Sequence, residues 1–204
     1  MMRLLLSVLL LGVMFTPLAA QDGLYAPRLD GETALVRVVN LQHSLPVDRL
    51  DIGPRRFGDI PPGGAGAYRS LAPGVYLVGG RDGVMLSPPP GSFRTVVVSG
   101  DGSPIIVEDT AHRDPARAQV VLYNFSSQPL SLLAPELQAV LLPEVAPGQS
   151  AARAVNALTV DLSVNPPAGD ARPVGTLELR RGESYGIFVT TEAVYVHQAR
   201  VVTD

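Results

Sequence analysis

Residues 34–40 read Ala-Leu-Val-Arg-Val-Val-Asn, and residues 118–124 repeat this pattern as Ala-Gln-Val-Val-Leu-Tyr-Asn. In the first stretch Leu35, Arg37 and Val39 share one face of an extended chain, and the two valines between them share the other. Alternation over a short β-branched run is typical of a strand in a sheet. The recurrence 84 residues later predicts that the chain holds two copies of one folding unit.

Two further pairs of segments correspond in the same order. Asp59–Arg69 lines up with Glu144–Arg153, and Gly91–Val98 lines up with Gly182–Val189. A duplicated unit of roughly 80 residues has the size of a small domain. A feature present in only one copy is therefore a candidate for specialised function, whereas a feature of both copies belongs to the scaffold.

The remaining pattern predicts an all-β protein built from two tandem, duplicated, small antiparallel β-sandwich domains. Short alternating runs are separated by turns, and the 19 prolines and 20 glycines interrupt helices but suit sheet edges and turns. We expect domain 1 over 32–109, a linker over 110–117 and domain 2 over 118–204. Each copy closes its first strand with asparagine, Asn40 or Asn124, which we expect to be a turn residue in a left-handed conformation.

The first twenty residues have the form of a secretory signal peptide. Arg3 precedes a short apolar run, and the segment ends in small residues, so we expect cleavage after Ala20. Residues 21–31 then form a short N-terminal tail. The chain has no cysteine, so neither disulfides nor thiolate metal sites are expected.

Charge and motifs exclude several classes of function. Without Arg3 the chain has 15 arginines against 19 acidic residues, a net charge of about −4, which argues against nucleic-acid binding. His43, His112 and His197 are isolated and fit no metal-binding motif, so we predict no metal and no cofactor. The glycines of Gly63–Gly66 are expected to form a turn, because no lysine is present to complete a phosphate loop.

Catalytic residues are not evident from spacing. Ser70 is the serine that we consider first as a nucleophile, but the sequence offers it no neighbouring base. Glu108 and Asp109 form the densest acidic pair, and a solvated strand end accounts for them. The sequence therefore favours a noncatalytic protein.

Tyr25, Tyr68 and Arg69 are the candidates for surface contacts to a partner or a glycan, although the filling of a sheet edge would also account for Tyr68 and Arg69. Tyr25 lies in the tail, and Tyr68 stands beside Arg69, which is a pair of residue types favoured at protein interfaces. The second copy has only alanine and arginine at the corresponding place, Ala152 and Arg153. We therefore expect the specific contact to be made by the first half of the chain.

Short motifs spread along nearly the whole mature chain resemble the AlgF family of periplasmic alginate biosynthesis proteins. They follow the signal peptide in this order: Leu24–Pro27, Val36–Asn40, Ala67–Leu71, Pro73–Tyr76, Val107–Asp109, and Arg181–Glu183 leading to Phe188–Thr190.

The resemblance implies a periplasmic protein of two small β-sandwiches that serves the O-acetylation of a secreted polysaccharide, alginate or a related exopolysaccharide. It also implies two partners, a membrane-anchored acetyltransferase of the AlgJ type and a membrane O-acyltransferase of the AlgI type. It supplies no catalytic residues. The word acetyltransferase then describes the pathway rather than the chemistry of this chain.

Three interpretations remain open at this level. The first is a noncatalytic adaptor that docks a partner acetyltransferase and contacts the polysaccharide. The second is an acetyl carrier or transferase that acts through a surface hydroxyl such as Ser70. The third is a general carbohydrate-binding or cell-surface β module.

Overall fold

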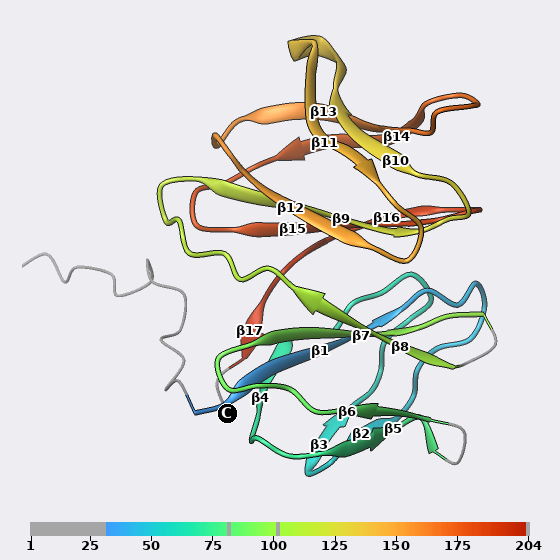
Figure 1. Ribbon diagram of the computed structural model, residues 1–204, viewed down its shortest axis with the longest axis vertical. Helices are drawn as coiled ribbons and strands as arrows, with labels where there is room; N and C mark the ends of the chain where they lie inside the picture. The colour runs from blue at the N-terminus through green and yellow to red at the C-terminus, as the bar shows by residue number, and fades with distance from the viewer. Residues whose placement is uncertain (1–31, 81–82, 101–102, 203–204) are drawn as a thin grey trace, which may run out of the picture.

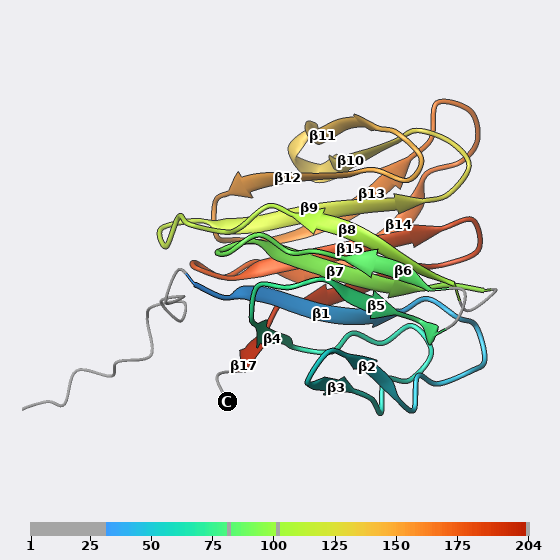
Figure 2. The same ribbon diagram turned by 60° about the horizontal axis from the view of Figure 1, so that its bottom comes forward.

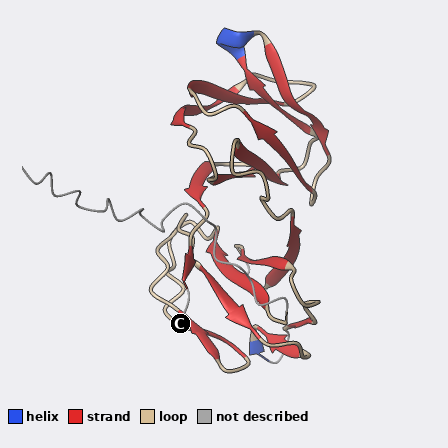
Figure 3. Cartoon of the chain, turned by 90° about the vertical axis from the view of Figure 1, so that its left-hand side faces the viewer, coloured by secondary structure: helices blue, strands red, loops and turns tan. Residues whose placement is uncertain are grey.

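The computed structural model describes residues 32–80, 83–100 and 103–202 (Figure 1). The predicted cleavage site at Ala20 and the tail with Tyr25 lie outside the described residues. Strands dominate both halves of the molecule, and a short 3-10 turn, Pro135–Leu137, lies at the tip of the second half (Figure 3).

The strands of the first half run from residue 34 to residue 109, and those of the second half follow from residue 118. The first half holds β1 (Ala34–Asn40), β2 (Leu50–Ile52), β3 (Arg55–Phe57), β4 (Tyr68–Leu71), β5 (Tyr76–Val78), β6 (Val84–Leu86), β7 (Phe93–Val98) and β8 (Pro104–Asp109). The second half holds β9 (Ala118–Phe125), β10 (Leu130–Ala134), β11 (Ala139–Val145), β12 (Ser150–Val155), β13 (Thr159–Asn165), β14 (Arg172–Glu178), β15 (Ser184–Thr190), β16 (Val194–Gln198) and β17 (Val201–Val202).

The strands form four stacked layers (Figures 1 and 2). The outer layer of the second half is a sheet in the order β11-β10-β13-β14, and its inner layer has the order β12-β9-β15-β16. The inner layer of the first half has the order β17-β4-β1-β7-β8, and the hairpins β2-β3 and β5-β6 form its outer layer. The all-β class and the two-domain arrangement are thereby confirmed.

Strand direction differs from the purely antiparallel expectation. In the two inner sheets β1 runs parallel to β7, and β9 runs parallel to β15. Parallel neighbours need a long crossover connection. Here the intervening chain forms the strand on the other side of β1 or β9, which is β4 or β12, and the whole outer layer before it returns. A repeat of short alternating runs fits either direction, so the sequence pattern did not distinguish them.

The two inner sheets are buried on both faces because they pack against each other as well as against their own outer layers. Val36 and Val38 of β1 point into the core of the first half. Val39, from the other face of the same strand, packs with Tyr123 and Phe188 of the second half in a third hydrophobic cluster. We call the contact between the two inner sheets the seam.

Asn40 and Asn124 make matching contacts in the two halves. Each is fully buried, and each side-chain amide donates to two backbone carbonyls, among them those of Ile60 and Val145 respectively. The left-handed conformation expected for these asparagines is absent, since among non-glycine residues of the described chain positive φ angles occur at Asp59, Gln138 and Glu144. The asparagines therefore hold the loops by hydrogen bonds while other residues make the turns.

The end of the chain returns to the first half. β17 pairs in parallel with β4, and the amide of Tyr68 donates to the carbonyl of Arg200 at 2.7 Å. Figure 1 shows this strand, coloured red, running from the second half to the edge of the first sheet. The two halves are thus connected twice, by the segment between β8 and β9 and by this C-terminal strap. The boundaries 32–109 and 118–204 remain a proposal, and the strap crosses between them.

A glycine permits the close stacking at the seam. A Cβ atom at Gly186 would lie 2.8 Å from the ring of Phe188 and 3.3 Å from that of Tyr123. We expect Gly186→Ala to lower the free energy of unfolding by about 1–3 kcal/mol, because the stacked rings must shift. Urea denaturation measures this loss. Gly100→Ala is the matched control, because a Cβ atom there meets nothing within 4 Å, and an equal loss in both variants would contradict the assignment.

Candidate functional site

A buried arginine lies at the centre of the seam. Arg37 is in the middle of β1, on the face that looks away from the core of the first half, and only 2% of it is exposed. Alternation along the strand dictates this direction, since Val36 and Val38 occupy the opposite face. A buried guanidinium needs partners for its N–H groups, so its surroundings define the chemistry of the seam.

The partners of Arg37 form one hydrogen-bonded cluster across the two halves. The Nε group donates to Thr95 Oγ1 at 2.8 Å, and an Nη2 group donates to the hydroxyl of Tyr123 at 2.9 Å. Asp109 then accepts from three hydroxyls, those of Tyr123 at 2.5 Å, Tyr68 at 2.8 Å and Thr95 at 2.6 Å. Tyr123 comes from the second half, so this arginine cluster joins the domains through charge-assisted hydrogen bonds.

Aromatic rings surround the guanidinium. The ring of Tyr68 lies 4.6 Å from the guanidinium carbon, and the rings of Phe188 and Tyr123 lie 5.4 Å and 5.7 Å away. Tyr123 and Phe188 are stacked with their planes 1° apart and their centroids 4.2 Å apart. The cation therefore meets electron-rich ring faces where it lacks hydrogen-bond acceptors.

Protonation states in the arginine cluster are fixed by its surroundings. Burial raises the pKa of Tyr68 and of Tyr123 well above its ordinary value, against the opposing effect of Arg37, so both phenols remain protonated donors. Burial lowers the pKa of Arg37, but interactions with Tyr68, Tyr123 and Asp109 more than compensate, and the net shift is upward. Among the described residues no buried side-chain nitrogen or oxygen lacks a hydrogen bond. This cluster is thus a hydrogen-bonded joint between the two halves.

Two histidines bond across the seam. His197 of β16 donates from Nε2 to the carbonyl of Gly63 at 2.6 Å. Burial and the charge of Arg37 lower the pKa of His197 below 6.5, although the bond to Gly63 partly opposes this. His43, in the loop after β1, pairs with Glu192 of the β15–β16 turn at 2.5 Å, and both side chains are largely exposed.

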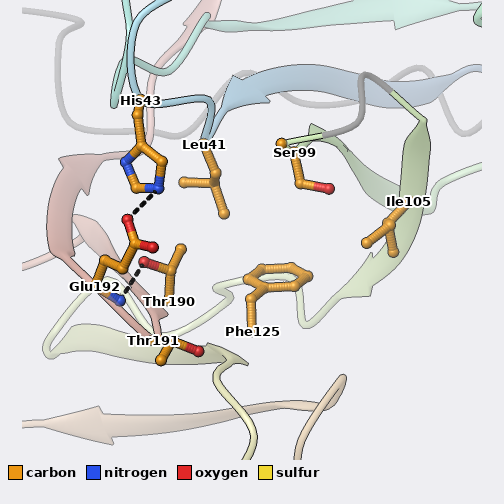
Figure 4. Close-up of a pocket in the computed structure, with 9 residues that line it drawn as sticks. Leu41, His43, Ser99, Ile105, Phe125, Thr190, Thr191 and Glu192 are labelled. Atoms are coloured by element: carbon orange, nitrogen blue, oxygen red, sulfur yellow. Dashed lines mark hydrogen bonds and ion pairs between the residues drawn. The ribbon is translucent and has the colours of Figure 1, made fainter.

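An open groove of about 260 Å³ follows the seam beside the His43–Glu192 pair, and we call it the seam groove (Figure 4). Residues from both halves line it: Leu41, His43, Ser99, Gly100, Ile105, Phe125, Thr190, Thr191 and Glu192. In Figure 4 the side chain of Leu41 lies between His43 and Ser99, so these two do not form a nucleophile and base.

The residues predicted from the sequence do not come together at one site. Tyr68 is only 4% exposed and belongs to the arginine cluster, although it also lines a cavity of about 100 Å³. Arg69 is half-buried, donates to the carbonyl of Arg56 at 3.2 Å and lies 6.0 Å from the ring of Phe57. Ser70 Oγ accepts a hydrogen bond from Arg55 Nη2 at 2.9 Å. The contact roles of Tyr68 and Arg69 stay predictions.

Sequence reasoning missed the residues that hold the seam together. The sequence predicts a solvated strand end at Asp109, yet this carboxylate accepts three hydrogen bonds at the seam. The alternation that places Arg37 on a face with Leu35 and Val39 is a signal that could have found the arginine cluster. A charge between two apolar neighbours on one strand face indicates a partner on another element.

Metal and membrane features complete the description. The residues 32–80, 83–100 and 103–202 contain no group of three or more histidine, cysteine or acidic side chains placed to hold a metal ion. No helix in the same part of the chain is long and apolar enough to span a membrane.

These features define a class of protein. It is an all-β protein of two domains that are joined face to face through a buried arginine cluster, with an open groove along the joint.

Comparison with known proteins places the chain more narrowly. The model of a family described as alginate O-acetyl transferase AlgF matches residues 7–186, so the chain belongs to the AlgF family.

Three curated relatives carry the name alginate biosynthesis protein AlgF. The protein of Pseudomonas aeruginosa is 28% identical over 86% of this chain and 81% of its own length. Those of Pseudomonas syringae and Pseudomonas putida are 25% and 27% identical over 88% and 84% of this chain, and over 81% and 79% of their own lengths. A solved structure of the C-terminal domain of AlgF from P. aeruginosa is 22% identical, and its TM-score is 0.35 over 41% of this chain and 93% of that one.

The arginine cluster gives a prediction for stability. Arg37→Met keeps the volume but leaves Asp109 without the compensating cation, so we expect the free energy of unfolding to fall by about 3–5 kcal/mol. Urea denaturation at pH 7 measures the change. Arg180→Met, at an exposed arginine paired with Glu178, should change stability little. Equal effects of the two substitutions would contradict a joint built on Arg37.

His197 gives a prediction for pH dependence. Because the folded state holds this imidazole neutral at a pKa below 6.5, the unfolded state binds more protons, and stability falls as the pH falls through about 6.5. His197→Gln keeps a donor for the carbonyl of Gly63 but does not titrate. We expect the decline in melting temperature between about pH 7.5 and 5 to be smaller in this variant. An unchanged decline would assign the pH dependence to other groups.

Proposed function

We propose that this chain is a noncatalytic periplasmic accessory protein for the O-acetylation of a secreted polysaccharide, alginate or a related exopolysaccharide. It acts as an adaptor for a membrane-anchored acetyltransferase of the AlgJ type, in a system that also contains a membrane O-acyltransferase of the AlgI type. The observation that carries the proposal is the family match over residues 7–186, whose description names alginate O-acetylation.

The geometry of the seam supports an adaptor rather than an enzyme. Arg37, Asp109, Tyr68 and Tyr123 are the groups with catalytic potential at the centre of the molecule, and each bonds to another of them. Their effect is to hold two sandwiches in one orientation. A body of two domains fixed in this way can present distant surfaces to two partners at once.

The outer hairpin of the first half offers a docking surface for the acetyltransferase. Leu77 and Met85 are cross-strand neighbours on β5 and β6, so they share a face with Val75, which lies two residues before Leu77. These three side chains are 50%, 59% and 66% exposed. Neighbouring exposed apolar side chains of this kind mark protein contacts.

Deletion of the gene in the producing organism tests the role. We expect the polymer to be made in normal amount but with its O-acetyl groups lost, as measured by proton NMR of the purified polysaccharide. Complementation with Ser70→Ala should restore acetylation, because the adaptor role does not use that hydroxyl. Full acetylation in the deletion strain would refute the proposal, and failure of Ser70→Ala alone would support the acetyl carrier instead.

Copurification tests the docking surface. Leu77→Glu should lower the amount of AlgJ-type protein that copurifies with the tagged chain, because a charge enters an apolar contact. Leu137→Glu is the matched control, since Leu137 is 56% exposed on the 3-10 turn at the opposite end of the molecule. Equal recovery of the partner with both variants would place the contact elsewhere.

A further inference from the structure

The seam groove is built by equivalent strand ends of the two halves. Leu41 and His43 follow β1, and Ser99 follows β7, the parallel neighbour of β1. In the second half Phe125 ends β9, and Thr190 ends β15, the parallel neighbour of β9. These four strands are internal in their sheets, and the arginine cluster fixes the two sheets against each other. The groove is therefore framed by strands that are hydrogen-bonded on both sides and held together by the arginine cluster.

One part of the groove lining is apolar. Phe125 is half-buried and presents its ring to the groove, between Leu41 and Ile105 (Figure 4). Ile105 is 42% exposed. This surface would be covered most favourably by a small apolar group or by the C–H face of a ring.

The other part of the lining offers hydrogen bonds that the protein does not use itself. The hydroxyls of Ser99 and Thr191 form no hydrogen bond with other described residues, whereas Thr190 Oγ1 already accepts from the amide of Ala193. His43 uses Nε2 toward Glu192, which leaves its other ring nitrogen and the second carboxylate oxygen of Glu192 open. These groups lie around the apolar side chains, with Ser99 between Leu41 and Ile105 and Thr191 beside Phe125 (Figure 4).

The charge of the groove excludes simple attraction of a polyanion. Among the described residues that line the groove, Glu192 and His43 are the titratable ones, they face each other, and none is an arginine. A ligand must therefore be recognised through hydroxyls and apolar groups rather than through carboxylates. The volume of about 260 Å³ lies just below the range of pockets that hold drug-sized ligands. A groove of this volume fits one sugar ring with its substituent.

We propose that the seam groove binds one O-acetylated sugar unit of the polysaccharide, with the acetyl methyl on the wall of Phe125, Leu41 and Ile105. The sugar hydroxyls bond to Ser99, Thr191 and Glu192, and the carboxylate of a uronate points to solvent. The choice of ligand rests on the proposed role in polysaccharide O-acetylation. The adaptor would then hold acetylated product beside its docked enzyme.

Titration of the ¹⁵N-labelled mature protein with acetylated mannuronate oligosaccharides tests this site by NMR. We expect amide shifts at Ser99, Phe125 and Thr191. Removal of the acetyl esters by mild base should weaken binding about fivefold, because a buried methyl and carbonyl are lost. Raising the salt from about 0.05 to 0.5 M should change the dissociation constant less than about twofold, since the contact is not ionic.

Variants locate the ligand. Phe125→Ala should weaken binding more than about tenfold. Glu192→Gln, which keeps the size of the side chain, should weaken it by a smaller factor. Leu137→Ala, at an exposed leucine far from the groove, should leave binding unchanged. Melting temperatures of all three variants check that each is folded.

Several outcomes would overturn the site. The first two are amide shifts confined to other surfaces and equal binding of the acetylated and de-acetylated oligosaccharides. The others are a dissociation constant that rises steeply with salt, and amide shifts at the groove that only the AlgJ-type protein causes, with none from the oligosaccharide. Each can occur in a chain that still restores acetylation in the deletion strain, so failure of the groove proposal is distinct from failure of the adaptor proposal.

Discussion

A guanidinium removed from water is the constraint on which this molecule depends. Arg37 is too deeply buried to be solvated, so every element near it must supply a hydrogen-bond acceptor or a ring face. Thr95 and Tyr68 come from neighbouring strands of its own sheet, Asp109 from the last strand of the first half, and Tyr123 from the second half. The arginine cluster therefore holds the two domains together as one body. Separating them would leave the charge of Arg37 without its partner Tyr123 and would expose the stacked rings of Tyr123 and Phe188.

The two halves share their framework and differ at the seam. Asn40 and Asn124 hold equivalent loops by equivalent bonds, and the inner sheets have the same strand order apart from the strap. Where β1 carries Arg37, the matching residue of β9 is Val121, which packs in the apolar part of the same seam. The guanidinium at the centre of the polar cluster is thus a feature of the first half that the equivalent strand of the second half lacks.

Much of the fold could be predicted from local pattern, because strands and turns are encoded in short stretches. The alternation in residues 34–40 predicts β1 and both of its faces, and the recurrence of the pattern at 118–124 predicts β9. Relations between distant segments could not be predicted. The parallel pairing of β1 with β7, the burial of Tyr68 and the role of Asp109 all depend on which sheets meet, and no window of sequence contains that information. The seam groove could not be predicted for the same reason, because its lining residues come from five separate segments of the chain.

The C-terminal strap has a consequence for the order in which the chain completes itself. A polypeptide made from its N-terminus exposes β4 as a bare sheet edge, with unpaired amides, until residues 200–202 have been synthesised. The sheet of the first half therefore gains its edge strand only after the second half has been synthesised. Pairing of residues 200–202 with β4 is therefore a late step in forming the edge of the first sheet.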